Sequence, residues 1–97
     1  MRQFTSAQCD AALAELTASS YSLTAYRIGE ALACAKYREA EALALGAWFA
    51  LSDQHSYAKK SKRNEALYLA MENVARVHLY CRQTAEDAES IAQAVAS

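Results

Sequence analysis

The sequence contains no proline and only two glycines in 97 residues. Turn-rich β architectures depend on such turn-forming residues, so they are disfavoured. Hydrophobic residues make up 54% of the chain and charged residues 22%, which also disfavours disorder. The composition therefore predicts long helices, within one helical domain that spans 1–97.

Neither an excess of one charge nor a long apolar run is present. The formal net charge is −1, so the whole chain lacks the positive field of a dedicated nucleic-acid binder. The segment 1–4 lacks the apolar character of a secretory signal, and no segment approaches the roughly 20 apolar residues that span a bilayer. The sequence therefore predicts a cytoplasmic protein that does not enter membranes.

Cysteine and histidine are too few for the chemistry they usually support. Cys9, Cys34 and Cys81 are odd in number and widely spaced, which fits neither a disulfide framework nor a zinc knuckle. We predict that they are small buried apolar side chains. His78 and Cys81 share a helix face, but zinc needs three or four protein ligands and no second pair exists. With no phosphate-binding glycine loop and no nucleophile beside a base, we predict a non-enzyme without metal or cofactor.

Helix signals divide the chain into helical segments and one basic connector. Thr5 and Gln8 form a capping-box pattern that predicts a helix over 6–18, and the serines near 20 end it. Nearly every residue that follows is a good helix former and no turn signal intervenes, so one long helix is predicted over 22–52. A basic connector over 53–63, a helix over 64–83 and a further helix or continuation over 84–96 complete the prediction.

Two of these helices carry apolar faces. In the second half of the chain, one face holds Leu67, Ala70, Met71, Val74, Val77, His78 and Cys81, and it continues through Ala85, Ala88, Ala92 and Val95. On the predicted helix 22–52, one sector holds Tyr26, Gly29, Ala33, Tyr37, Ala40, Ala44, Ala47 and Leu51, and the next sector holds Ile28, Leu32, Leu43 and Ala50. Such a wide apolar surface must be covered on two sides, either by other helices of the chain or by a partner.

The sequence thus predicts an all-α fold: a small bundle of three to four helices around two long antiparallel ones, completed by a homodimer or an obligate helical partner. Another possibility comes from the stretches 26–32 with 37–40 and 75–80 with 87–89, which resemble tetratricopeptide helix pairs. That resemblance implies helical hairpins and a chaperone or co-chaperone. The chain departs from the family in lacking its proline and its turn glycine or asparagine, and in spacing the units beyond 34 residues.

Candidate binding residues fall into two groups. Aromatic, arginine and leucine side chains expected at interfaces form a predicted partner-binding set, which comprises Tyr26, Tyr37, Arg38, Leu69, Leu79 and Tyr80. A basic set that could grip phosphates or an acidic surface comprises Lys59, Lys60, Lys62 and Arg63. The favoured function is a non-catalytic interaction module, such as an accessory, chaperone or inhibitor protein of bacteria or phages that masks a partner. Nucleic-acid or nucleotide binding through the basic set is the alternative.

Overall fold

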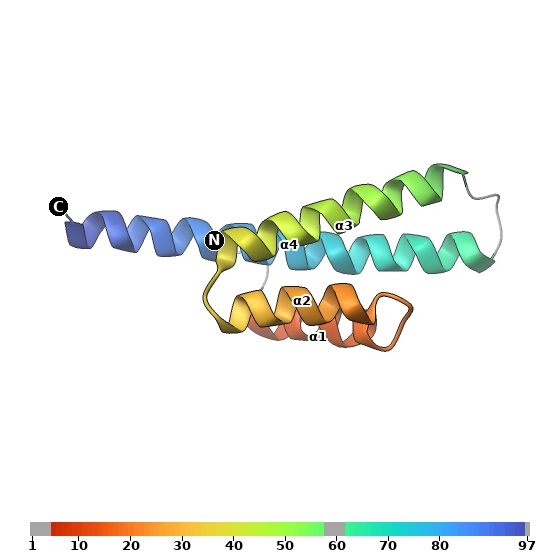
Figure 1. Ribbon diagram of the computed structural model, residues 1–97, viewed down its shortest axis with the longest axis horizontal. Helices are drawn as coiled ribbons and strands as arrows, with labels where there is room; N and C mark the ends of the chain where they lie inside the picture. The colour runs from red at the N-terminus through yellow and green to blue at the C-terminus, as the bar shows by residue number, and fades with distance from the viewer. Residues whose placement is uncertain (1–4, 58–61, 97) are drawn as a thin grey trace.

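The computed structural model describes the backbone of residues 5–57 and 62–96 and the side chains of 5–54 and 65–96. Within these ranges the regular structure is entirely α-helical, and short turns join the helices. Four helices follow one another: α1 (Ser6–Thr17), α2 (Ser22–Ala33), α3 (Tyr37–Tyr57) and α4 (Lys62–Ala96) (Figure 1). The predicted all-α bundle around two long antiparallel helices is confirmed, since α3 and α4 pack along each other.

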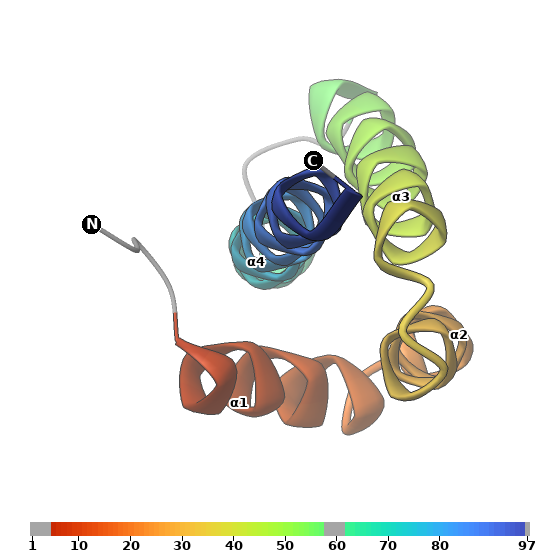
Figure 2. The ribbon, with the colours of Figure 1, turned by 90° about the vertical axis from the view of Figure 1, so that its left-hand side faces the viewer.

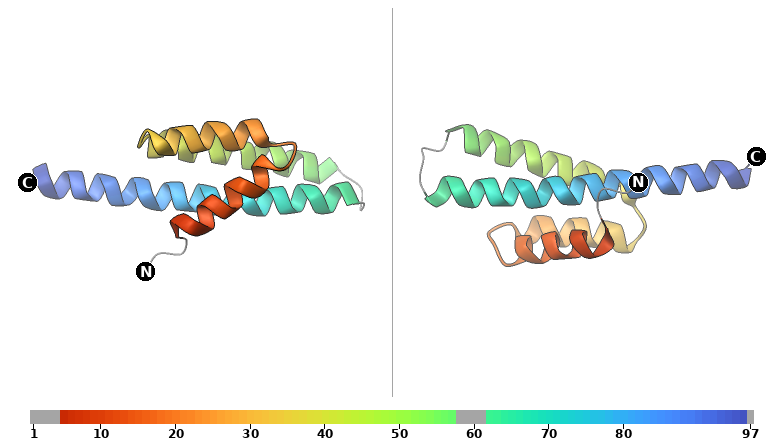
Figure 3. Two further views of the ribbon diagram at one scale, coloured as in Figure 1. Left: turned by 90° about the horizontal axis from the view of Figure 1, so that it is seen from below. Right: turned by 180° about the vertical axis from the view of Figure 1, so that it is seen from behind.

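The helices close a ring of contacts around one core. Helix α1 packs on α2 and α4, and α3 packs on α2 and α4 (Figure 2). The short α1–α2 pair lies along one side of the α3–α4 hairpin, with α1 crossing α4 obliquely (Figure 3). Helix α4 continues past the other helices, so the molecule measures 54 × 22 × 22 Å.

The first helix begins as its sequence predicts. The Thr5 hydroxyl oxygen accepts a hydrogen bond from the backbone N–H of Gln8 (3.2 Å), and the Thr5 N–H donates to Gln8 Oε1 (2.8 Å). At the other end, the Ser19 hydroxyl donates to the Leu16 carbonyl (2.6 Å), which supports the turn into α2. The reciprocal hydrogen bonds between Thr5 and Gln8 satisfy backbone N–H groups that the start of a helix leaves without partners.

The prediction of one helix over 22–52 is wrong, because the chain turns between α2 and α3. Ala35 adopts a left-handed conformation with φ of 59°. Its N–H donates to the Leu32 carbonyl (3.0 Å), and the Lys36 N–H donates to the Ala31 carbonyl (2.8 Å). These two bonds define a Schellman motif, in which glycine usually occupies the left-handed position. With alanine there, the sequence carries no stop signal.

The turn changes which faces are buried on either side of it. Ala40 and Ala44 of α3 are buried, whereas Tyr26 of α2 is 67% exposed and Ala33 is exposed. Helix α2 instead buries Ile28 together with small neighbours. The single apolar sector predicted across 22–52 therefore does not exist as one surface.

The remaining helix boundaries also differ from the prediction. Residues 53–57 belong to α3 and residues 62 and 63 to α4, so the basic connector is shorter than predicted, and 58–61 lie outside the described residues. The open question of a break near Thr84 is settled, since α4 runs without interruption for 35 residues. Arg82 and Glu86 pair across this point (3.2 Å), one turn apart on the helix.

The core consists mainly of small side chains. Its buried residues are Cys9, Ala12, Leu16, Ala25, Ile28, Ala31, Ala40, Ala44, Leu51, Leu67, Ala70, Val74, Val77 and Cys81. Small residues let helices approach closely, which suits the tight ring of four. Among the residues whose side chains are described, one polar side chain is buried with them: Asn73 donates from Nδ2 to Glu15 Oε2 (2.7 Å), which joins α4 to α1.

Candidate protein-binding surface

The apolar stripe of α4 extends beyond the helices that cover it. Apolar or small residues recur at alternating spacings of three and four: Leu67, Ala70, Val74, Val77, Cys81, Thr84, Ala88, Ile91 and Val95. This is a heptad pattern, typical of a helix that packs along another helix. The first five are buried, Thr84 and Ala88 are half-buried, and Ile91 and Val95 are 65% and 82% exposed. The face predicted from the sequence also reaches Val95, but it passes through Ala85 and Ala92 and includes neither Thr84 nor Ile91. The structure shows that the last part of the stripe is uncovered.

We define the α4 overhang as residues 89–96, all of which are exposed. It begins where α3 begins, and an arginine joins the two. Arg38 of α3 donates to both carboxylate oxygens of Glu89, with Nε–Oε2 and Nη2–Oε1 distances of 2.7 Å, and it also donates to Glu41 (3.1 Å). These hydrogen bonds lower the pKa of Glu89 and raise the pKa of Arg38.

A groove lies between the overhang and the first turn of α3. Its volume is about 450 Å³. We call it the terminal groove, and its lining comprises Ala35, Lys36, Tyr37, Arg38, Glu39, Ala85, Ala88, Glu89 and Ala92. Alanines of α4 supply an apolar floor, while charged side chains from the first turn of α3 supply one rim.

In the structure, the residues of the predicted partner-binding set lie on separate parts of the molecule. Tyr37 and Arg38 meet in the terminal groove, but Tyr26 is exposed on α2, and Leu69 is exposed toward the opposite end of α4. Leu79 is 36% exposed. These five residues therefore do not form one continuous surface.

Tyr80, the remaining residue of this set, is half-buried against the core. It lies two helical turns beyond Asn73, whose amide contacts Glu15 of α1. This side of α4 therefore faces α1, which the helix periodicity of α4 alone does not reveal.

The predicted anion-binding set falls at the edge of the described residues. Lys59 and Lys60 lie outside them. Lys62 and Arg63 belong to the first turn of α4, and their side chains are outside the description. Binding of nucleic acid or a nucleotide through this set stays a prediction.

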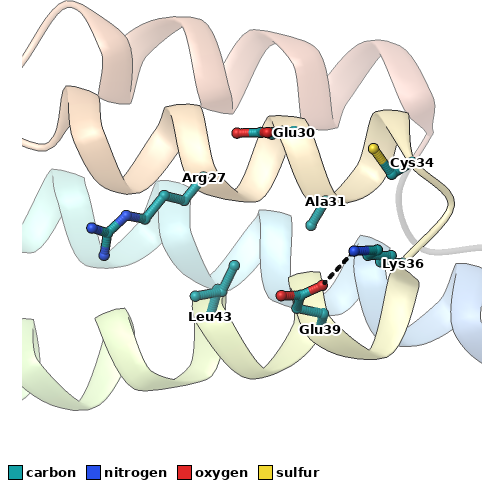
Figure 4. A pocket seen from close by; sticks show the side chains of 7 residues that line it. All are labelled: Arg27, Glu30, Ala31, Cys34, Lys36, Glu39 and Leu43. Carbon is teal, nitrogen blue, oxygen red and sulfur yellow. Dashed lines mark ion pairs between the residues drawn. The ribbon is translucent and has the colours of Figure 1, made fainter.

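Two further hollows flank the α1–α2 pair. The larger, of about 680 Å³, lies between the end of α1 and the α3–α4 hairpin, and Leu69, Gln54 and Asn73 are among its lining residues. The smaller, of about 270 Å³, lies between α2 and α3 and is lined by Arg27, Glu30, Ala31, Cys34, Lys36, Glu39 and Leu43 (Figure 4). Its charges alternate in sign, and Lys36 pairs with Glu39 (4.0 Å).

The three thiols occupy different environments. Cys9 and Cys81 are buried as predicted, and burial raises their pKa values to about 11 and about 12. Cys34 is exposed, so the prediction that it is buried is wrong. It is the C-cap residue that follows Ala33, the last residue of α2, and the unpredicted turn places it at the surface. Within the described residues, no three His, Cys, Asp or Glu side chains gather closely enough to hold a metal ion.

None of the helices, over the residues that the structure describes, combines the length and apolar character needed to cross a membrane. Comparison of the chain with protein-family models, curated proteins and solved structures gives no match. The resemblance of two stretches to tetratricopeptide helix pairs is thus not accompanied by a match to a family.

Proposed function

We propose that the protein is a non-catalytic, cytoplasmic interaction module that binds a partner protein by helix packing on the α4 overhang. The observation that carries this proposal is the continuation of the α4 stripe past the bundle. The residues that pack the core and the residues that face solvent belong to one heptad series, which ends with Ile91 and Val95.

Energetics support a role for the overhang in binding. Burying one isoleucine or valine side chain stabilises a structure by roughly 1.5–3 kcal/mol, which Ile91 and Val95 do not gain in the isolated chain. Ala88 and Ala92 lie on the same side, and small residues allow a second helix to come close. A helix of a partner protein is therefore the kind of surface that fits here, as expected for a small accessory, chaperone or inhibitor protein.

Site-specific photo-crosslinking in cells tests this proposal. A photo-reactive amino acid replaces Val95 in one variant and Ser90, on the other side of the overhang, in a matched control. We expect a protein adduct from position 95 and little or none from position 90. Equal labelling from both positions, or none from position 95, contradicts binding by the apolar stripe.

A further inference from the structure

We propose that the occupant of the terminal groove is the α4 overhang of a second copy of this chain, packed antiparallel in a reciprocal, two-fold symmetric dimer. This inference rests on the proposed function, since it names the helix that the stripe receives. In such an arrangement each copy supplies one groove and one overhang, so both contacts are identical.

Side-chain size favours the antiparallel direction. When two overhangs run in opposite directions around a centre between Ile91 and Ala92, each Val95 faces an Ala88 and each Ile91 faces an Ala92. Every contact then pairs a large side chain with a small one, which fills space without crowding. In the parallel direction, large side chains meet large ones and alanines meet alanines, so the packing is uneven.

Charge favours the same direction. The acidic residues Glu86, Asp87 and Glu89 precede a segment, 90–96, that contains no charged residue. Antiparallel pairing places the acidic stretch of each helix opposite the neutral stretch of the other, whereas parallel pairing places the acidic stretches side by side. The charge pattern of the overhang therefore favours antiparallel pairing of two copies.

The start of α3 favours the end of another helix through its backbone dipole. The carbonyl groups at the end of a helix carry partial negative charge, and the N–H groups at its start carry partial positive charge. An incoming overhang directs its end toward the first turn of α3, where Lys36 is paired with Glu39 and Arg38 is paired with Glu41 and Glu89, so the charges of these two cations are already balanced. The match between the incoming helix and the groove therefore rests on the opposite ends of the two helix dipoles and on the apolar floor formed by Ala85, Ala88 and Ala92.

The overlap is short, so the dimer is expected to be reversible. Stable complexes usually bury about 1,600 Å² in total, and weak ones bury less than about 1,200 Å². Two overhangs of two turns each fall in the weak class, even with the groove included. Association should therefore depend on concentration.

Sedimentation equilibrium on the full chain, from about 10 µM to about 1 mM, measures this association in the range that a small interface requires. We expect the mass to rise from one chain toward two. Val95→Glu should keep the protein monomeric, and Ser90→Glu should associate as the wild type does. The double variant Val95→Glu with Ala88→Lys should regain the dimer, because antiparallel pairing places each new glutamate opposite a new lysine. Circular dichroism confirms that each variant retains its helices.

A wild-type chain that stays monomeric throughout, or a dimer insensitive to Val95→Glu, overturns this inference. Failure of the double variant to recover association overturns the antiparallel register. The proposed function is tested separately. If the chain is monomeric but position 95 crosslinks to a different protein, the dimer is overturned and the proposed interaction module stands.

Discussion

Arg38 and Glu89 meet through two parallel hydrogen bonds of 2.7 Å, at the point where α4 leaves the bundle. The pairing is bidentate, the geometry in which a guanidinium and a carboxylate bind with most specificity. It fixes the start of α3 against α4, and thereby fixes the width of the terminal groove. Four predictions follow from this and other contacts.

Replacing Arg38 with glutamine should raise the pKa of Glu89 toward the ordinary carboxylate range. The hydrogen bond from Arg38 is the main cause of the lowered value, with desolvation acting in the opposite direction. A lowered pKa contributes stability above the ordinary carboxylate pKa, and this stability is lost as pH falls through the lowered value. Titration of the Glu89 carboxyl carbon by NMR measures the change. Arg82→Gln removes the partner of Glu86 instead and should leave Glu89 unaffected.

Ala35→Gly should raise the free energy of unfolding by on the order of 1 kcal/mol. A left-handed conformation costs a residue with a Cβ roughly 1–2 kcal/mol, more than the entropy that glycine loses on folding. Ala42→Gly, at an exposed position within α3, should instead lower the free energy of unfolding by roughly 1 kcal/mol. Chemical denaturation of both variants reports the sign, and a loss of stability at position 35 would contradict strain in the turn.

Thr84→Val should stabilise the protein by about 1 kcal/mol. The Thr84 hydroxyl oxygen is buried and has no hydrogen-bond partner among the described residues, a state that costs about 1–3 kcal/mol. Thr17→Val is the matched control, because the exposed Thr17 hydroxyl donates to the Leu13 carbonyl (2.8 Å). Thermal unfolding compares the two variants. Equal changes would show that the burial of the Thr84 hydroxyl has no energetic consequence.

Only one of the three thiols should react quickly in the folded protein. Thiolates react far faster than thiols, and burial keeps Cys9 and Cys81 protonated, with pKa values raised to about 11 and about 12. Cys34 is exposed. A disulfide reagent at about pH 8, near the ordinary thiol pKa, should label one thiol in the native chain and three after denaturation. Cys34→Ser should remove the fast phase, and a remaining fast phase would mean that a core thiol is accessible.

Periodicity and capping predicted much of this fold. The Thr5–Gln8 cap and the buried residues of α4 follow from local sequence, because a helix start and an amphipathic face depend on neighbouring residues alone. The break at Ala35 could not be predicted in the same way. Alanine is the best helix former, and the left-handed turn is stabilised by the packing of α2 on α3, which is a tertiary effect.

The binding surface was predicted only in fragments. Tyr37 and Arg38 were identified from residue type, but their proximity to Glu89 depends on how α3 and α4 align. Val95 was assigned to the core stripe, and its exposure depends on where the neighbouring helices end. A helical wheel shows which residues share a face and does not show how far along the axis that face is covered. Ile91 is absent from the predicted face for a different reason, since that face follows the alanines at 85, 88 and 92.

The hydrogen bond between Asn73 and Glu15 has a consequence for the uniqueness of the fold. The buried residues of α1 are Cys9, Ala12 and Leu16, so Leu16 is the one large buried side chain that positions this helix by packing. Asn73 adds a second constraint, because a slip of α1 by one turn would take Glu15 away from the buried Nδ2 group of Asn73, at a cost of about 1–3 kcal/mol. This polar pair thus adds to the packing that sets the register of two helices, as one asparagine does in many coiled coils.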